Sequence, residues 1–281
     1  MHDVLDVLGD PWSLRILHAV ACGVDRFQSL VESLEVPRAT LAGRLKALVA
    51  DECLATLGYA KNRSTYVLTP KGADAIGAIA LLRQWTAKRD LAGPTLRHRC
   101  GAVASLEAVC ADCGRPLVAS EITTLDFPTH PKAKAEALPP VPSYRRARSV
   151  LGDKPTSFDA EDCIGDRWAS LVIGAMLFGL RRFGEIEEAI GIAPNILSAR
   201  LDLMIHAGIV DSRNERYALT KRGADLFPAI MALTTWGERW LAPKRKKAPT
   251  WALLHVPCAR WLRTEVICKP CGEPFREEEE T

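Results

Sequence analysis

The chain has 281 residues, of which 48% are hydrophobic and 25% charged, with a net charge of +3 and a pI near 8.4. These values are typical of a soluble globular protein of two domains, and the mild basic excess permits an anionic partner without requiring one. No apolar run is long enough to cross a bilayer, and the N-terminal MHDVLDVLGDPW lacks the apolar centre of a signal peptide. We therefore expect a cytoplasmic protein whose nine cysteines stay reduced.

The first part of the chain predicts three helices followed by a hairpin. Apolar residues favour a buried helix over 12–21, and Phe27–Leu34 carries apolar side chains at helical spacing. A turn at Val36-Pro37 precedes a helix over 38–50 with one leucine face. The segment LATLGYAKNRSTYVLT then predicts two short strands around a basic tip, and a further helix follows over 70–89. Helix, tight turn, helix and basic hairpin form the order of a winged helix-turn-helix domain.

Such a domain suits double-stranded DNA. A helix fits the major groove, where its outward side chains can reach base edges, and a basic hairpin tip can reach phosphates or the minor groove. The alternative is that the polar residues merely form a solvated face. The candidate DNA-binding residues of this copy are Arg38, Thr40, Arg44 and Lys46 in the helix over 38–50, and Lys61 and Arg63 in the tip.

A cluster of possible metal ligands follows in HRCGAVASLEAVCADCG, which contains His98, Cys100, Cys110 and Cys113. A Cys-x-x-Cys-Gly turn supplies half of a tetrahedral zinc site. The His-x-Cys half is tight, although a strand would place both side chains on one face. We favour structural zinc that holds a segment with little core of its own. A Cys-x-x-Cys redox pair and packed free thiols stay open as alternatives.

The stretch after this cluster is rich in proline and lysine or arginine, and it predicts a linker over 121–157. It separates a first domain over 1–120, including its cluster, from a second over 158–276. The last residues, 277–281, form an acidic tail.

The second domain repeats the first. When Trp12 is aligned with Trp168, matching residues recur through both copies: Gly23 with Gly179, Phe27 with Phe183, Leu41 with Leu197, Arg44 with Arg200, Tyr66 with Tyr217, Gly72 with Gly223 and Trp85 with Trp236. Helices are predicted over 183–190 and 195–206, before a short wing, DSRNERY.

The second copy offers its own DNA-binding candidates: Asn195, Ser198, Arg200, Arg213 and Arg216. We expect Arg44 and Arg200, which share one position, to clamp phosphates. Asp202 stands where the first copy has Lys46. A carboxylate can accept a hydrogen bond from cytosine, but weaker DNA binding by this copy is the interpretation we favour.

A second cluster, in HVPCARWLRTEVICKPCG, contains His255, Cys258, Cys268 and Cys271. Its spacing nearly repeats the first, so the sequence predicts one zinc site for each copy, each made from four ligands of that copy.

The combined pattern resembles the HxlR-type winged-helix regulators, which are relatives of the MarR regulators. It comprises a Trp-led helix, Gly and then Arg-Phe, Leu-x-x-Arg-Leu, Tyr-x-Leu-Thr-x-x-Gly and a final Trp, over residues 3–89 and 160–240. The resemblance implies DNA binding as a dimer joined by terminal helices, here fused into one chain. Redox-sensing members have a cysteine upstream of the position of Cys163, where the first copy has Val7, so thiol sensing is not transferred.

We expect a fold that is mainly α with small β hairpins (α+β): two tandem winged helix-turn-helix domains forming an intrachain pseudo-dimer, each followed by a zinc-ribbon-like segment. The expected function is a DNA-binding transcription regulator, a repressor, that reads two half-sites in adjacent major grooves about 34 Å apart. It is a monomeric pseudo-dimer or a homodimer without a membrane partner. The tryptophans pack the core or line a small-molecule effector pocket. A redox-responsive regulator and a protein-interaction adaptor are the alternatives. No catalytic motif is present, so we expect no enzyme.

Overall fold

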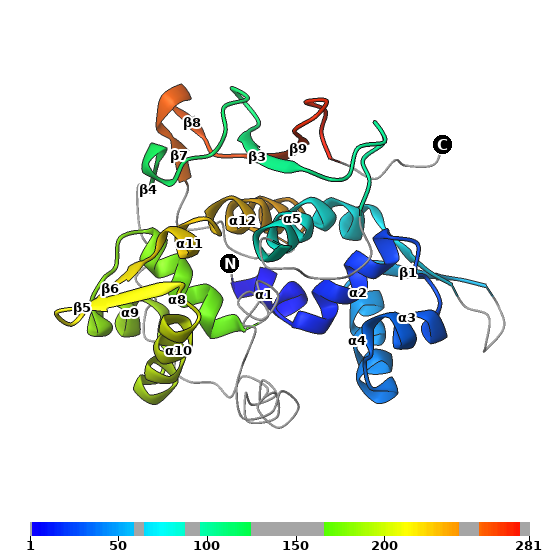
Figure 1. Ribbon diagram of the computed structural model, residues 1–281, viewed down its shortest axis with the longest axis horizontal. Coiled ribbons are helices and arrows are strands. Elements are labelled where there is room, and N and C mark those ends of the chain that lie inside the picture. The colour runs from blue at the N-terminus through cyan, green and yellow to red at the C-terminus, as the bar shows by residue number, and fades with distance from the viewer. Residues whose placement is uncertain (1, 59–64, 88–95, 125–165, 242–252, 276–281) are drawn as a thin grey trace. The chain divides into compact units, whose positions relative to one another are not determined.

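The computed structural model describes residues 2–58, 65–87, 96–124, 166–241 and 253–275 (Figure 1). The chain forms two compact units. The first contains residues 1–126, 160–167 and 225–281, and the second contains residues 127–159 and 168–224. The first unit therefore combines the whole first copy with the C-terminal part of the second copy.

The first unit begins with four helices: α1 (His2–Leu8), α2 (Pro11–Ala21), α3 (Phe27–Leu34) and α4 (Arg38–Ala50). Asp10 starts α2, because its carboxylate accepts a hydrogen bond from the Ser13 backbone N–H at 3.1 Å and Pro11 has the fixed φ that suits a first helical position. Gly23 ends the same helix with a φ of +84°, a conformation that glycine adopts without strain.

A hairpin follows α4, formed by β1 (Leu54–Leu57) and β2 (Thr65–Leu68), which pair antiparallel with Leu54 opposite Leu68. The next helix, α5 (Pro70–Ala87), starts against the hairpin. The Thr69 hydroxyl donates to the Glu52 carbonyl at 2.5 Å and accepts from the Gly72 N–H at 3.2 Å. This explains the Thr-x-x-Gly motif, since a Cβ on Gly72 would lie 2.0 Å from the Cys53 carbonyl oxygen.

Helix α5 packs against α12 (Phe227–Trp240), the terminal helix of the second copy. The Trp236 indole N–H donates to the Lys71 carbonyl at 2.9 Å, and Asp74 accepts from the Trp240 indole at 2.8 Å and from Arg239 at 2.5 Å. Trp236 is only 2% exposed. The paired terminal helices thus share a buried interface with polar contacts at its margin.

One pair of strands lies against this helix pair (Figure 1). β3 (Leu106–Cys110) pairs antiparallel with β9 (Thr264–Cys268). A second sheet has the order β4-β7-β8, from β4 (Ile122–Thr124), β7 (Leu253–His255) and β8 (Arg260–Trp261). Short 3-10 turns precede β4 at Ala119–Glu121 and follow β7 at Val256–Cys258.

The second unit repeats the helix-turn-helix and the wing. Its elements are α8 (Arg167–Leu177), α9 (Phe183–Ile190), α10 (Pro194–His206), β5 (Val210–Arg213), β6 (Arg216–Leu219) and α11 (Lys221–Ala224). The unit itself starts at Trp168, the second residue of α8. Thr220 repeats the role of Thr69: its hydroxyl donates to the Gly208 carbonyl at 2.7 Å and accepts from the Gly223 N–H at 3.2 Å. The motif therefore closes the wing in both copies.

The two copies differ in their last helix. The first copy has one continuous helix, α5, whereas the second has the short α11 followed by α12. Pro228 lies at the start of α12, where a missing N–H is tolerated, but in mid-helix it would remove a backbone hydrogen bond. This single residue accounts for the break.

The predicted mainly helical fold with small hairpins is confirmed, and the helices at 27–34, 38–50 and 183–190 have the predicted bounds. The linker prediction was wrong at its first residues, because Ile122–Thr124 form β4 and pair with β7. That pairing involves residues more than a hundred positions away, which local composition cannot indicate. Among the described residues, no helix combines the length and hydropathy that a membrane span requires.

Candidate nucleic-acid interface and metal centres

The helix-turn-helix of the first copy turns at Glu35 and Pro37. Glu35 has a φ of +50° and ends α3, and Pro37 precedes the first residue of α4. Leu41, Leu45 and Leu48 of α4 are buried. These contacts fix the rotation of α4 about its axis and leave its other face to solvent, where the exposed residues are Arg38, Ala39, Ala42, Gly43, Lys46 and Ala50.

The candidates on α4 have different surroundings. Arg38 is exposed at the start of the helix, where its guanidinium bonds to the Gln28 side chain and lies 5.9 Å from the centre of the Phe27 ring. Lys46 is exposed and Thr40 is half-buried. Arg38 is therefore held on the surface by α3, while Lys46 extends toward solvent.

Arg44 has a structural contact that the sequence analysis missed. Its guanidinium pairs with the Asp10 carboxylate at 2.8 Å, and the two side chains are 31% and 20% exposed. The same carboxylate caps α2. Arg44 therefore braces α4 against the start of α2, and any phosphate that it binds must share the guanidinium with Asp10. Asp166 stands at the position of Asp10 in the second copy. The spacing in the sequence gave no sign of the contact between Arg44 and Asp10.

The second copy exposes the same face of its equivalent helix, but with different residues on it. Gly191, with a φ of +64°, ends α9. In α10, Asn195, Ser198 and Asp202 are exposed and Arg200 is half-buried. Buried Leu197, Leu201 and Met204 form the inner stripe that the sequence predicts.

The wing of the second copy is a tight hairpin. Asn214 and Glu215 form its tip with φ values of +50° and +59°, as in a type I′ turn. Arg213 and Arg216 flank the tip and are exposed, and Arg213 pairs with Asp211 at 2.9 Å. Lys61 and Arg63, the candidates at the first wing's tip, lie outside the described residues.

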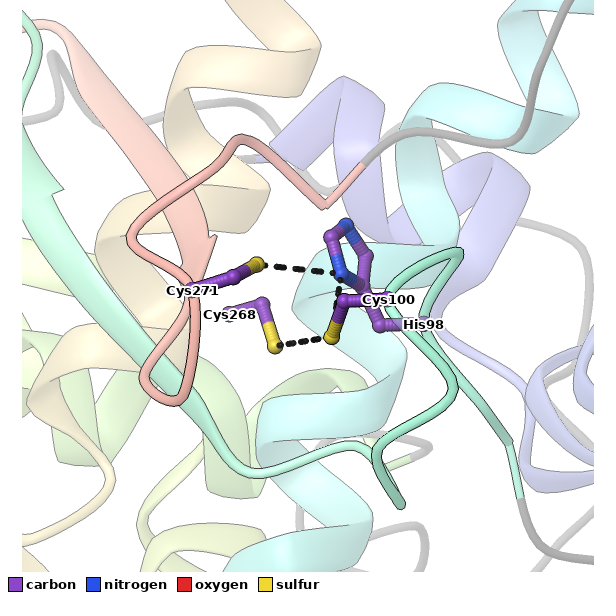
Figure 2. A group of neighbouring side chains, drawn as sticks. All are labelled: His98, Cys100, Cys268 and Cys271. Carbon is purple, nitrogen blue, oxygen red and sulfur yellow. Dashed lines mark hydrogen bonds between the residues drawn. The ribbon is translucent and has the colours of Figure 1, made fainter.

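The eight predicted metal ligands form two compact clusters. The first contains His98, Cys100, Cys268 and Cys271 (Figure 2). His98 Nδ1 lies 3.2 Å from Cys100 Sγ and 3.3 Å from Cys271 Sγ, and the Cys100 and Cys268 sulfurs are 3.9 Å apart. The four ligand atoms lie within 4.8 Å of one another.

The histidine of the first cluster is oriented by a backbone contact. Its Nε2 lies 3.3 Å from the Pro274 carbonyl oxygen. A carbonyl can only accept, so Nε2 carries the proton and Nδ1 presents its lone pair to the sulfurs. Ligand histidines are usually oriented in this way by a hydrogen bond on the other nitrogen.

The second cluster contains Cys110, Cys113, His255 and Cys258. His255 Nδ1 lies 3.2 Å from Cys258 Sγ and 3.5 Å from Cys113 Sγ, and the Cys110 and Cys258 sulfurs are 3.9 Å apart. The His255 ring is fully buried, and its Nε2 lies 3.8 Å from a carboxylate oxygen of Glu121. The clusters therefore have the same donor set and closely similar distances.

The prediction of one site per copy was wrong in its pairing. Each cluster takes a His and a Cys from one copy and the Cys-x-x-Cys from the other. The reason is the pairing of β3 with β9, which run antiparallel and carry the two Cys-x-x-Cys turns to opposite ends of the strand pair.

The distances fit a tetrahedral ion. Zinc–sulfur bonds of about 2.3 Å at tetrahedral angles place two sulfurs about 3.8 Å apart, close to the 3.9 Å of both clusters. A disulfide would require about 2.05 Å. One cysteine of each Cys-x-x-Cys is buried: burial raises the pKa of Cys110, and it raises the pKa of Cys268 to about 11. A bound cation would stabilise these buried thiolates.

Comparison with known proteins finds relatives that are named HTH-type transcriptional regulators. An uncharacterized HTH-type transcriptional regulator of Mycobacterium bovis is 37% identical over 121 residues, which are 41% of this chain and 75% of the relative. One of Bacillus subtilis is 33% identical over 30% of this chain and 85% of the relative. The candidate transcription factor PA1374 of Pseudomonas aeruginosa aligns at 31% identity over 36% of this chain and 71% of that chain, with a TM-score of 0.29.

The family assignment covers both copies. Because 121 residues are 75% of the mycobacterial relative, that protein has about 160 residues, enough for one copy and too few for two. The model of the HxlR-like helix-turn-helix family matches residues 7–91 and again residues 163–245. More than half of the chain is matched, and the protein therefore belongs to the HxlR-like helix-turn-helix family, with two copies of its domain.

Proposed function

We propose that this protein is a sequence-specific, double-stranded DNA-binding transcription regulator that acts as a repressor. The observation that carries the proposal is the repeated helix-turn-helix, in which α4 and α10 each bury a leucine-rich stripe and expose the opposite face. Family membership and the names of the relatives support the same class. One recognition helix in each copy, α4 or α10, suits two half-sites in adjacent major grooves, about 34 Å apart.

The residues proposed to contact DNA divide by role. Asn195 and Ser198 lie near the start of α10 and have side chains suited to base edges. Arg38, Lys46, Arg213 and Arg216 are exposed cations suited to phosphates. Arg44, which is held by Asp10, would set the position of α4 as well as contact the backbone. Lys61 and Arg63 are proposed from the sequence alone.

The proposal is tested by selecting bound fragments from the source genome with the full chain, followed by footprinting of the enriched site. We expect protection of two related half-sites about one helical turn apart. The variant Arg38→Ala/Lys46→Ala, which changes only exposed residues of α4, should weaken binding and reduce its salt dependence. A lack of enrichment at low and moderate salt would refute DNA binding and favour a protein-interaction adaptor.

We further propose that the two clusters hold structural zinc, since three thiolates and one imidazole are a common zinc donor set and leave no open position. Metal analysis of protein purified without added metal tests this, and two equivalents of zinc are expected. If the thiols instead responded to oxidation as a sensor, oxidant would change DNA affinity in protein that contains no metal.

A small-molecule effector is also proposed, with a candidate place beside α5, α12 and β9. The groove there is lined by Asp74, Trp236, Arg239, Thr264 and Phe275, among others. The buried Thr264 hydroxyl has no hydrogen-bond partner among the described residues. Such a group favours a polar ligand atom. Saturation-transfer NMR with small aromatic acids, compared between the parent and Thr264→Val, tests this site.

A further inference from the structure

The strand pair β3–β9 has an internal symmetry. Cys110 corresponds to Cys268 and Cys113 to Cys271 in the two copies, a displacement of 158 residues. The same displacement relates Ala108 to Val266, and these two residues lie directly opposite each other in the strand pair. One repeated segment is therefore paired with its own second copy, about a local two-fold axis at Ala108 and Val266.

Contacts beyond the strands follow the same symmetry. The Ala111 N–H donates to the Arg263 carbonyl at 2.8 Å, and at the other end the Lys269 N–H donates to the Ser105 carbonyl, also at 2.8 Å. Ala111 corresponds to Lys269 and Ser105 to Arg263. Equal contacts at both ends are what an isologous dimer interface shows, although here both partners belong to one chain.

Ion pairs between the copies accompany each end. Arg263 pairs with Asp112 at 2.8 Å beside the second cluster, and Arg99 pairs with Glu273 at 3.2 Å beside the first. Arg99 and Glu273 are both more than half exposed, so their pair contributes little stability by itself. In the other pair, Arg263 is 66% and Asp112 is 19% exposed. The strands alone, at five residues each, also form a small interface.

We propose that each zinc ion bridges the two copies, so that the pair of ions locks the terminal modules of the two copies together. This inference rests on the proposed zinc. Each cluster takes two residues from each copy: His98 and Cys100 with Cys268 and Cys271, and His255 and Cys258 with Cys110 and Cys113. Neither copy can complete either site without the other.

The lock also reaches the helix pair. Val266 lies against Gly77 of α5, where an added Cβ would meet its side chain at 3.1 Å. The Thr264 backbone N–H donates to the Thr235 hydroxyl of α12 at 3.1 Å. Because β9 contacts both helices, ions that hold the strand pair also hold α5 against α12. Zinc binding therefore stabilises the interface that joins the copies.

A pair of matched double variants tests which cysteines share an ion. Cys100→Ser/Cys268→Ser removes two ligands of one observed cluster, whereas Cys100→Ser/Cys110→Ser removes one ligand from each. Each double variant replaces one exposed and one buried cysteine, so the two variants should lose similar amounts of stability from the substitutions themselves. Bridging ions predict one tightly held zinc in the first variant and none in the second, by native mass spectrometry after dialysis against a chelator.

The opposite pattern, with no zinc in the first variant and one in the second, would overturn the inference and restore one site per copy. A parent protein that contains no zinc would refute the zinc proposal itself, and the DNA-binding proposal would be unaffected. The two failures are therefore distinguishable.

A measurement on the unaltered chain covers the case in which a variant does not fold. Protein loaded with one equivalent of zinc is alkylated, and singly loaded molecules are sequenced intact by mass spectrometry. Bridging ions protect three cysteines together in one of two sets: Cys100, Cys268 and Cys271, or Cys110, Cys113 and Cys258. Joint protection of Cys100, Cys110 and Cys113 would contradict the proposal.

Discussion

The exposed carboxylate of Asp202 is the clearest place to test whether α10 lies on DNA. Lys46 occupies the same position on α4, and both side chains are exposed. The variant Asp202→Lys therefore gives α10 the charge that α4 has at this position, without disturbing the buried stripe of α10. If α10 enters a major groove, the change replaces a repulsion from the phosphates by an attraction, and binding should tighten.

The magnitude follows from the charges. A carboxylate about 5 Å from a phosphate in water is repelled by roughly 0.8 kcal/mol, a factor of about 4 in affinity. One new lysine–phosphate contact changes the slope of log K against log salt by about −0.9. Relative to 1 M salt, this raises the affinity at 0.1 M salt by about 8-fold. We expect binding roughly 10- to 30-fold tighter at that salt concentration.

Fluorescence anisotropy with the selected operator, at several salt concentrations, measures both quantities. Glu238→Lys makes the same change in net charge at an exposed residue of α12, which belongs to the terminal helix pair, and serves as the control. Equal effects of the two variants, or a tighter complex with an unchanged salt slope, would show that position 202 has no phosphate neighbour and would refute the placement of α10.

Three further predictions concern stability. Gly72→Ala should lower the free energy of unfolding by about 2–4 kcal/mol, because its Cβ would lie 2.0 Å from the Cys53 carbonyl oxygen; urea unfolding within 0.5 kcal/mol of the parent would contradict this. Gly43→Ala, in exposed mid-α4 with no atom within 4 Å of the new Cβ, should stabilise by about 0.5–1 kcal/mol in the same assay. Burial, with the nearby charge of Arg83, lowers the pKa of His18 to about 3. As pH falls, the unfolded state therefore binds a proton at His18 before the folded state does. The free energy of unfolding falls by up to about 1.4 kcal/mol per pH unit between pH 6.5 and 3 for this reason. In His18→Gln, the free energy of unfolding should depend less steeply on pH, by about one proton, and an identical pH dependence would exclude this role.

The helices were predictable because their signals are local. The bounds of α3, α4 and α9 follow from apolar spacing over eight to thirteen residues, with turns at their ends. The Thr-x-x-Gly motif was visible as well, but its cause was not. Gly72 is needed because α5 starts against the Cys53 carbonyl, a contact that exists only after the hairpin has formed.

The metal clusters show where local reasoning fails. The eight residues of the two clusters were singled out from their spacing, yet the spacing is the same whether a Cys-x-x-Cys pairs with the histidine of its own copy or of the other. The antiparallel pairing of β3 with β9 decides between these arrangements. A signal was present, since a chain expected to fold as a pseudo-dimer should exchange like segments across its axis. Arg44 gave no such signal, and its contact with Asp10 depends on the packing of α4 beside α2.

The two copies also differ in a way that the fused architecture explains. In a homodimer, both recognition helices have the same sequence, so a substitution in one is also present in the other. In this chain the exposed faces have diverged: Arg38 and Lys46 correspond to Pro194 and Asp202. Leu41 and Leu45 recur as Leu197 and Leu201, and each copy keeps one His and three Cys for the two clusters, because an interface between copies works only if each half still fits the other. It follows that the half-sites should be unequal, with α4 contributing the larger share of the salt dependence. Lys46→Asp should then reduce the salt slope, whereas Asp202→Asn should leave it nearly unchanged and relieve only the repulsion. Equal contributions from both helices would mean that the divergence on α10 serves something other than DNA.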